Sequence, residues 1–132
     1  MMTKPTMSIE DAKRVAAAAA ERAATKGWAV VIAILDDGAN LLYFERMDGA
    51  KLGSIRTAIE KARSSVLFAR PTKALEDIIG SGRNAMLRLP EATPIQGGLP
   101  LLHDGHLVGG IGVSGVLSPQ DEEAARAGAE AL

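Results

Sequence analysis

The chain contains no cysteine, which excludes disulfide bonds, thiolate zinc sites, iron–sulfur clusters and a cysteine nucleophile. Aromatic residues make up only 3% of the chain, so we expect a core of aliphatic side chains and alanine. Because these side chains are small, we expect the helices and strands around the core to approach one another closely. The net charge of −1 gives no basic surface of the kind that binds nucleic acid. No apolar run is long enough to cross a membrane, because the alanines at 16–20 lie between charged residues.

Length and composition predict one globular domain over residues 1–132. A chain of this length can bury a substantial core, and its 47% hydrophobic and 23% charged residues are typical of globular proteins. Residues 1–10 lack the apolar stretch of a secretory signal peptide. We therefore expect a cytoplasmic location.

The first half of the chain predicts helix, hairpin and helix. Ser8 is a good N-cap for an alanine-rich helix over residues 9–26. Apolar runs at 28–35 and 41–46 flank turn residues, as in a β-hairpin. A second helix follows over residues 52–69, with an apolar stripe at helical spacing. The members of that stripe are Leu52, Ile55, Ala58, Ile59, Ala62 and Val66.

The second half predicts a short helix, a second hairpin and a last helix. Pro71 ends the preceding helix, and Thr72 is the expected cap of the short one. Strands at 98–102 and 107–114 flank an Asp-Gly turn. Ser118 followed by proline is typical of a helix start. The order α-β-β-α-α-β-β-α, with two hairpins, predicts an α+β fold, an α/β sandwich with a mainly antiparallel sheet.

The glycine-rich run at 109–115 matches the dinucleotide pattern G-x-G-x-x-G, but its context differs. That pattern needs a second strand and an acidic residue about 20 residues later, whereas 17 residues follow Gly115 and read as one helix. Glycine in a strand usually marks close backbone approach. We expect the alanine-rich first helix, a partner subunit or a flat ligand to pack on this strand.

An ordered set of short motifs resembles one known family. The motifs are Asp36-Asp37-Gly38, residues 46–50, Lys61-Ala62, Pro71-Thr72, residues 97–100, Asp104-Gly105, residues 109–115 and Asp121-Glu122. Together they look like the GlcG/HbpS-like family, which includes the C-terminal domain of PduO-type corrinoid adenosyltransferases. The resemblance implies a homodimer or larger homo-oligomer, and haem binding in several members. Other members belong to catabolic operons.

Candidate iron ligands are few. Histidine is the usual haem ligand, and the chain has only His103 and His106, which flank a turn and are either solvated or ligating. The resemblance implies that some members use a histidine of the first helix, and residues 9–26 contain none. Met47 and Thr72 could be weak axial ligands, or a core methionine and a helix cap. No metal-ligand spacing stands out.

Two cations are candidates for binding an anionic ligand. Lys61 shares a polar helix face with serine and threonine residues, where it could bind a carboxylate or phosphate or lie solvated along the surface. Arg46, just after the second strand, could pair with a ligand carboxylate such as a haem propionate. Its alternative role is a structural ion pair with Asp48 or another acidic residue.

Backbone amides supply the remaining candidates. Gly97 and Gly98 precede a strand and offer amides that no side chain covers. Ser114 and Gly115 lie just before the last helix, and helix N-termini bind anions. The alternative for this turn is a plain helix cap formed by Ser118.

Three functions follow from these observations. The first is a small-molecule binding protein of the GlcG/HbpS-like type, with haem or another tetrapyrrole as the leading ligand. The second is an enzyme of a catabolic pathway acting on a small acidic metabolite held by Lys61 or Arg46. The third is a non-catalytic accessory oligomer. No catalytic constellation in the sequence decides among them, and the catalytic residues stay unknown.

Overall fold

Four helices and four strands occur in the predicted order in the computed structural model, which describes all 132 residues. The bounds are α1 Ile9–Thr25, β1 Val31–Asp36, β2 Leu41–Arg46, α2 Ser54–Leu67, α3 Thr72–Gly80, β3 Gly98–His103, β4 His106–Ser114 and α4 Ser118–Glu130. A short 3₁₀ helix, η1, covers Asn84–Arg88. No helix is long and apolar enough to cross a membrane.

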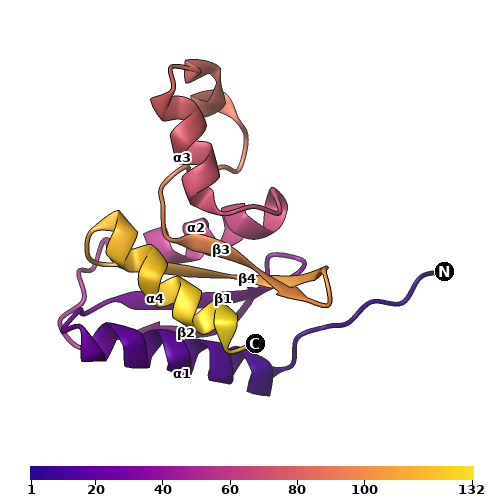
Figure 1. The fold of residues 1–132 in the computed structure, drawn as a ribbon, viewed down its shortest axis with the longest axis vertical. Helices are drawn as coiled ribbons and strands as arrows, with labels where there is room; N and C mark the ends of the chain where they lie inside the picture. The colour runs from indigo at the N-terminus through magenta and orange to yellow at the C-terminus, as the bar shows by residue number, and fades with distance from the viewer.

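The four strands form one antiparallel sheet in the order β2-β1-β4-β3 (Figure 1). Each hairpin supplies one central strand and one edge strand, and the two hairpins meet where β1 pairs with β4. Because β1 has neighbours on both sides and helices on both faces, its residues from Val31 to Leu35 are all buried. This explains why β1 reads as a continuous apolar run.

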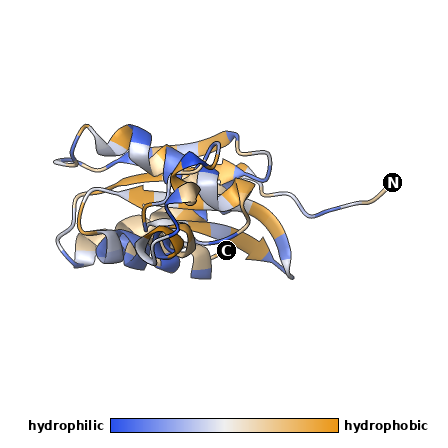
Figure 2. Cartoon of the chain, turned by 90° about the horizontal axis from the view of Figure 1, so that it is seen from above, coloured by the Kyte–Doolittle hydropathy of each residue, from blue (hydrophilic) through white to orange (hydrophobic).

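Helices cover both faces of the sheet, so the chain has three layers (Figure 2). On one face α1 and α4 pack on the sheet and on each other, around a core that includes Ile32, Ile34, Ile111 and Val113. On the other face α2 packs alone over a smaller cluster around Ala33. The predicted sandwich is confirmed.

The glycines of β4 let α2 approach the sheet backbone directly. A side chain at Gly112 would overlap the carbonyl oxygen of Ala58, and one at Gly110 would lie 2.5 Å from the Ser65 hydroxyl. The intervening residues of β4 point to the opposite face. The element packed on these two glycines is therefore α2, and not the alanine-rich first helix, a partner subunit or a flat ligand, which were the three alternatives expected.

The buried face of α2 is rotated from the predicted stripe. Leu52 lies before the helix and is 72% exposed. Ser54, Lys61 and Ser65, which were assigned to a polar face, are buried. Small polar side chains fit where helix and strand backbones touch, and their hydroxyl groups bond locally, as Ser65 does to the carbonyl of Ala62 at 2.7 Å.

Two predicted helix caps are wrong. Thr72 is the first residue of α3, and its hydroxyl bonds to the backbone of Gly98 in β3. Ser118 is the first residue of α4 and makes no capping bond. Instead the Asp121 carboxylate accepts the Val116 amide at 3.1 Å. The first turn of α4 is thus held by an acidic side chain from within the helix.

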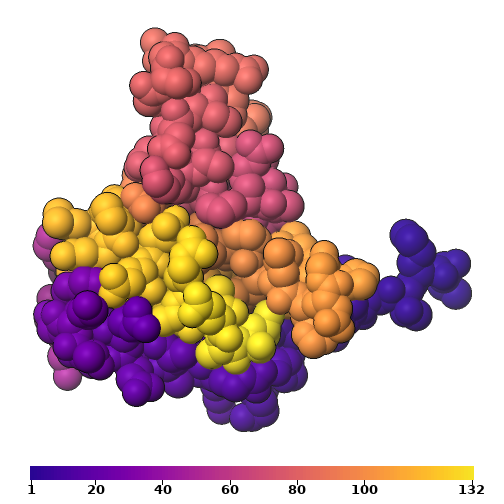
Figure 3. Space-filling model, in the orientation of Figure 1, coloured from indigo at the N-terminus to yellow at the C-terminus, as the bar shows by residue number.

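The segment from α3 to η1 projects from the body as an arm (Figures 1 and 3). Only Thr72 and Leu75 of α3 are buried, both near the base of the arm. η1 packs on α3 and closes the tip. The N-terminal segment extends from the body in another direction, beyond the start of α1 (Figure 3).

Candidate functional site

Most of the predicted ligand-binding residues gather at one end of the sheet, which we call the Gly97 end. Arg46 and Ser114 both pair with Val31, from opposite sides of β1. The Val113 amide donates to the Gly97 carbonyl at 3.0 Å. The fold therefore brings the ends of β2 and β4 and the start of β3 together, although these residues are far apart in the sequence.

Both interpretations of Lys61 from the sequence, anion binding and a solvated side chain, placed it on an open polar face of the helix. The structure shows that it is not on such a face. Its side chain is 2% exposed, and its ammonium donates to Asp121 Oδ2 at 3.1 Å and to the Val113 carbonyl at 3.0 Å. Lys61 belongs to α2 and Asp121 to α4, which lie on opposite faces of the sheet. The ion pair therefore passes the end of the sheet beside Gly97 and joins the two helical layers.

The anionic group bound at the Gly97 end is the side-chain carboxylate of Asp121, which belongs to the chain itself. Its carboxylate accepts the Lys61 ammonium and the Val116 amide, and its side chain is 3% exposed. Burial raises the pKa of Asp121, while the Lys61 charge and the Val116 and Gly115 amides oppose that rise. The pair was missed in the sequence because its members are 60 residues apart and no local pattern connects them.

The glycines at this end are also either hydrogen-bonded or closely surrounded by other atoms of the chain. The Gly98 amide donates to the Thr72 hydroxyl at 2.9 Å. A side chain at Gly97 would lie 2.8 Å from the Lys61 ammonium, and one at Gly115 would lie 2.7 Å from the Ala29 carbonyl oxygen. These glycines allow close packing around the ion pair.

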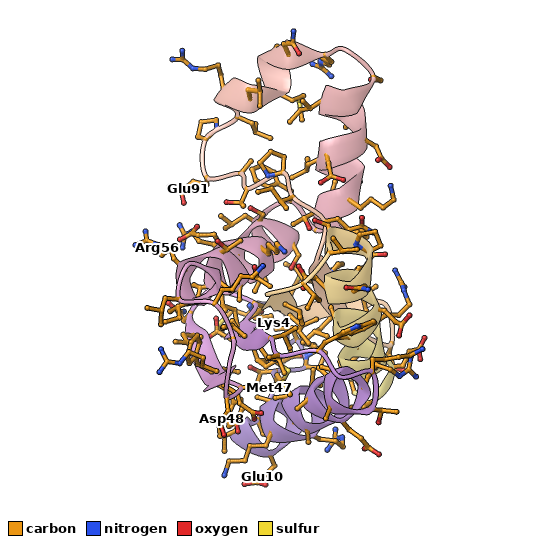
Figure 4. All side chains as sticks on the ribbon, turned by 90° about the vertical axis from the view of Figure 1, so that its left-hand side faces the viewer. Lys4, Glu10, Met47, Asp48, Arg56 and Glu91 are labelled. Carbon is orange, nitrogen blue, oxygen red and sulfur yellow. The ribbon has the colours of Figure 1, made fainter.

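Arg46 differs from the other predicted residues at this end. It is exposed, and neither an ion pair nor a hydrogen bond engages its guanidinium. The alternative of a structural ion pair with Asp48 or another acidic residue is therefore wrong. Met47 and Asp48, which follow Arg46, lie at the lower part of Figure 4. Among the predicted ligand-binding residues at the Gly97 end, Arg46 is the one with a free charged group.

The larger cavities lie elsewhere. One, the His103 cavity, has a volume of about 420 Å³ and lies at the opposite end of the sheet. Its lining consists of Pro5, Thr6, Met7, Asp11, Arg14, His103, Val108 and Leu132. A volume in this range is typical of small-molecule sites. No local sequence pattern indicated this cavity, because the N-terminal segment, α1, β3 and the C-terminus meet only in the fold.

The His103 cavity combines polar donors with apolar walls. His103 contributes an imidazole and Met7 a thioether, and Met7 is only 7% exposed. Arg14 donates to the Ala131 carbonyl at 3.0 Å and to Asp11 at 2.9 Å, which leaves further guanidinium N–H groups for a ligand. His106 pairs with His103 across the hairpin but does not line the cavity.

Asp11 is fixed as a carboxylate at the edge of the His103 cavity. It closes the α1 capping box by accepting the Ser8 amide and hydroxyl, each at 2.9 Å. These bonds and Arg14 lower the pKa of Asp11 to about 2. Because the folded-state pKa is depressed, the stabilisation from this cap is present above pH 4 and is lost as the pH falls towards 2.

A second hollow, the α2 groove, has a volume of about 600 Å³ and lies between α2 and the β1–β2 hairpin. Its apolar lining is formed by Leu35, Ala39, Leu41 and Ile59. Its charged lining is formed by Arg56, Glu60, Arg63 and Glu91, and Thr93 completes it. A third, smaller hollow of about 310 Å³ lies between α1 and α4. No group of three or more histidine, aspartate or glutamate side chains could hold a metal ion.

Comparison with known proteins places the chain in a family. The model of the family described as "Haem degrading protein HbpS-like" matches residues 7–130. The chain is 39% identical over 114 residues to Protein GlcG of Escherichia coli K12, covering 86% of this chain and 85% of GlcG. It therefore belongs to the HbpS-like family, as the sequence motifs predicted.

Two further relatives share the match. The chain is 31% identical over 135 residues to the corrinoid adenosyltransferase PduO of Salmonella typhimurium, covering 98% of this chain and 40% of PduO. It is 31% identical over 120 residues to an uncharacterized 15.0 kDa protein of Citrobacter freundii, covering 88% of this chain and 84% of that protein.

Solved structures agree with the family. The crystal structure of HbpS superposes with a TM-score of 0.91 at 33% identity, covering 100% of this chain and 94% of HbpS. A crystal structure of PduOC in complex with heme superposes with a TM-score of 0.87 at 30% identity, covering 97% of this chain and 96% of PduOC.

Proposed function

We propose that this protein binds haem or another tetrapyrrole in the His103 cavity. The observation that carries the proposal is the donor set of that cavity: one imidazole, one thioether and one guanidinium around apolar walls. Haem iron is held in proteins by histidine and methionine, among other ligands. Membership of the HbpS-like family and the heme complex of the related PduOC support the same ligand class.

Each residue has a defined part in this proposal. His103 would hold the iron, with Met7 as the candidate second ligand, and Arg14 would pair with a carboxylate of the ligand. Val108 and Leu132 would supply apolar contacts. Bound haem supplies a redox-active iron, and the chain supplies its ligands and charge partner.

A haemin titration tests the proposal. We expect saturable binding with a shifted Soret band for the wild type, and at least tenfold weaker binding for His103→Ala, because the iron loses its imidazole. His106→Ala is the matched control, since His106 is exposed on the same hairpin but outside the cavity. The proposal fails if the wild type shows no saturable binding, or if both histidine variants bind as it does.

A second candidate, binding or turnover of a small acidic metabolite, is favoured by the free guanidinium of Arg46. In this candidate the strand ends beside Arg46 are held in place by their neighbours. These neighbours are the Lys61–Asp121 pair, Gly97, Gly98, Ser114 and Gly115. Lys61 itself would not contact the ligand, because Asp121 already neutralises it. A carboxylate bound here would pair with a guanidinium that no acidic side chain of the chain neutralises.

Thermal shifts with a panel of short mono- and dicarboxylates test this second candidate. We expect a saturable rise in melting temperature that Arg46→Gln abolishes, because the carboxylate loses its charge partner. Arg83→Gln is the control, since Arg83 is also an exposed arginine without an ion pair, but lies on the arm. Equal shifts in both variants would remove Arg46 from the site.

We also propose that the chain assembles with copies of itself. Several large apolar side chains are exposed on the single chain, among them Leu41, Leu52 and Leu87. Other parts of the chain leave these side chains exposed. Assembly as a homodimer or larger homo-oligomer would cover them and is compatible with ligand binding, with catalysis or with an accessory role.

A further inference from the structure

The tip of the β3–β4 hairpin carries both histidines of the chain, directly opposite each other. His103 is the last residue of β3 and His106 the first of β4, and they form the final pair of the antiparallel ladder. Opposed residues in such a ladder have Cβ atoms about 4.5–5.5 Å apart. An imidazole nitrogen binds a metal ion at about 2 Å, so two imidazoles at this separation can bind one ion between them.

Both imidazoles lie on the same face of the sheet. Leu101, two residues before His103, belongs to the core under α1 and α4, whereas Leu107, the residue after His106, packs on the cluster under α2. Successive side chains of a strand point to opposite faces. His103 therefore lies on the α1 and α4 face with Leu101. His106 lies on that face too, because it points away from the side taken by Leu107.

The turn between the two histidines fixes their backbone positions. Asp104 has a φ of 48° and Gly105 a φ of 78°, as a two-residue type I′ turn requires. Because this turn matches the twist of the strands, the two ligands are in place before an ion binds, which lowers the entropy lost on binding. The Asp104 carboxylate, 3.4 Å from His103 Nε2, adds a negative charge beside the pair.

The open side of the histidine pair faces solvent. The His103 side chain is 59% exposed, and His106 is exposed at the tip of the hairpin, which protrudes from the sheet (Figure 1). Water can therefore complete the coordination of a bound ion, and a third protein ligand is not needed. The chain has no cysteine, so imidazoles are its preferred ligands for ions such as Cu²⁺, Ni²⁺ and Zn²⁺.

We infer that His103 and His106 form a chelating site for a divalent transition-metal ion. The two imidazoles bind the ion, and Asp104 favours its positive charge. This site goes beyond the proposed haem function, with which it shares His103 but not His106. The two proposals therefore make opposite predictions for His106→Ala: haemin binding is kept, and binding of the metal ion is weakened.

A titration with Cu²⁺ alone, followed by calorimetry and by the electron paramagnetic resonance of the bound ion, tests the inference. We expect one Cu²⁺ per chain with two nitrogen ligands. His103→Ala and His106→Ala should each bind at least tenfold more weakly, because the ion loses one of two ligands held at short range. The double variant H103A/H106A contains no histidine, so it measures any binding by other groups.

A relocated histidine provides the matched control. Leu102→His combined with His106→Ala keeps two histidines, but residue 102 is 56% exposed on the opposite face, so the cross-strand pair is lost without a change in the core. This variant should bind Cu²⁺ as weakly as His106→Ala alone. Affinity equal to the wild type in the relocated variant overturns the inference. So does a wild type that binds two ions as weakly as the single variants do, or one that binds no better than H103A/H106A. A wild type that binds Cu²⁺ in this way but no haemin overturns the haem proposal alone.

Discussion

Lys61→Met is expected to lower the free energy of unfolding by about 3–5 kcal/mol, the usual effect of removing one partner of a buried ion pair. The Asp121 carboxylate would stay buried with backbone amides as its only donors. Methionine keeps most of the unbranched stem, so little packing is lost. Urea unfolding followed by the fluorescence of Trp28, the sole tryptophan, measures the change.

The exposed pair of Lys73 and Asp77 on α3 provides the control for this prediction. Its members are one turn apart and about half exposed, and such pairs contribute about 0.3–0.5 kcal/mol. Lys73→Met should therefore be nearly neutral. A double variant, Lys61→Met with Asp121→Leu, should cost less than the sum of the two single changes, because it leaves no buried charge. A Lys61→Met variant as stable as the wild type would show that the buried pair adds no net stability.

Gly112→Ala is expected to be the most damaging single-methyl addition in the sheet. The added carbon would overlap the Ala58 carbonyl oxygen and lie 2.6 Å from the Ala62 amide. Both atoms are backbone, so no side chain can rotate away and α2 must separate from β4. Overpacking usually costs 1–3 kcal/mol, and we expect a loss of about 3 kcal/mol or more in urea unfolding.

Gly80→Ala is the matched control for Gly112→Ala. Gly80 is the last residue of α3, and nothing lies within 4 Å of the position an added carbon would take. Alanine is favoured over glycine in a helix by up to about 1 kcal/mol. Gly80→Ala should leave stability unchanged or raise it slightly. If Gly112→Ala were equally harmless, the helix–strand contact would be looser than described.

Local patterns in the sequence were sufficient to predict the elements and their order. Strands at 41–46 and a last helix near residue 118 depend on alternation, turns and helix-start signals, which act over a few residues. The glycines of β4 also correctly indicated close packing. Which helix makes that contact depends on the sheet order β2-β1-β4-β3, and no local pattern encodes that order.

The site was harder to predict because its chemistry depends on distant partners. A lysine among serine and threonine residues resembles an exposed polar face until Asp121, 60 residues later, is known to neutralise it. Leu52 appeared to begin the buried stripe of α2 by hydropathy alone. Backbone contact with the β4 glycines instead favoured small polar residues such as Ser54 and Ser65 on that face. The His103 cavity forms only where both chain ends meet the second hairpin.

Helix α4 is fastened near both ends, and this has a mechanical consequence. Near its start Asp121 holds Lys61 of α2, and just beyond its end the Ala131 carbonyl accepts the Arg14 side chain. Thirteen helical residues span about 20 Å at 1.5 Å per residue, so α4 acts as a rod between these two attachments. Helix α4 therefore spans the distance from the His103 cavity to the Lys61–Asp121 pair. Its far end is tied to α2, one wall of the groove on the other side of the sheet.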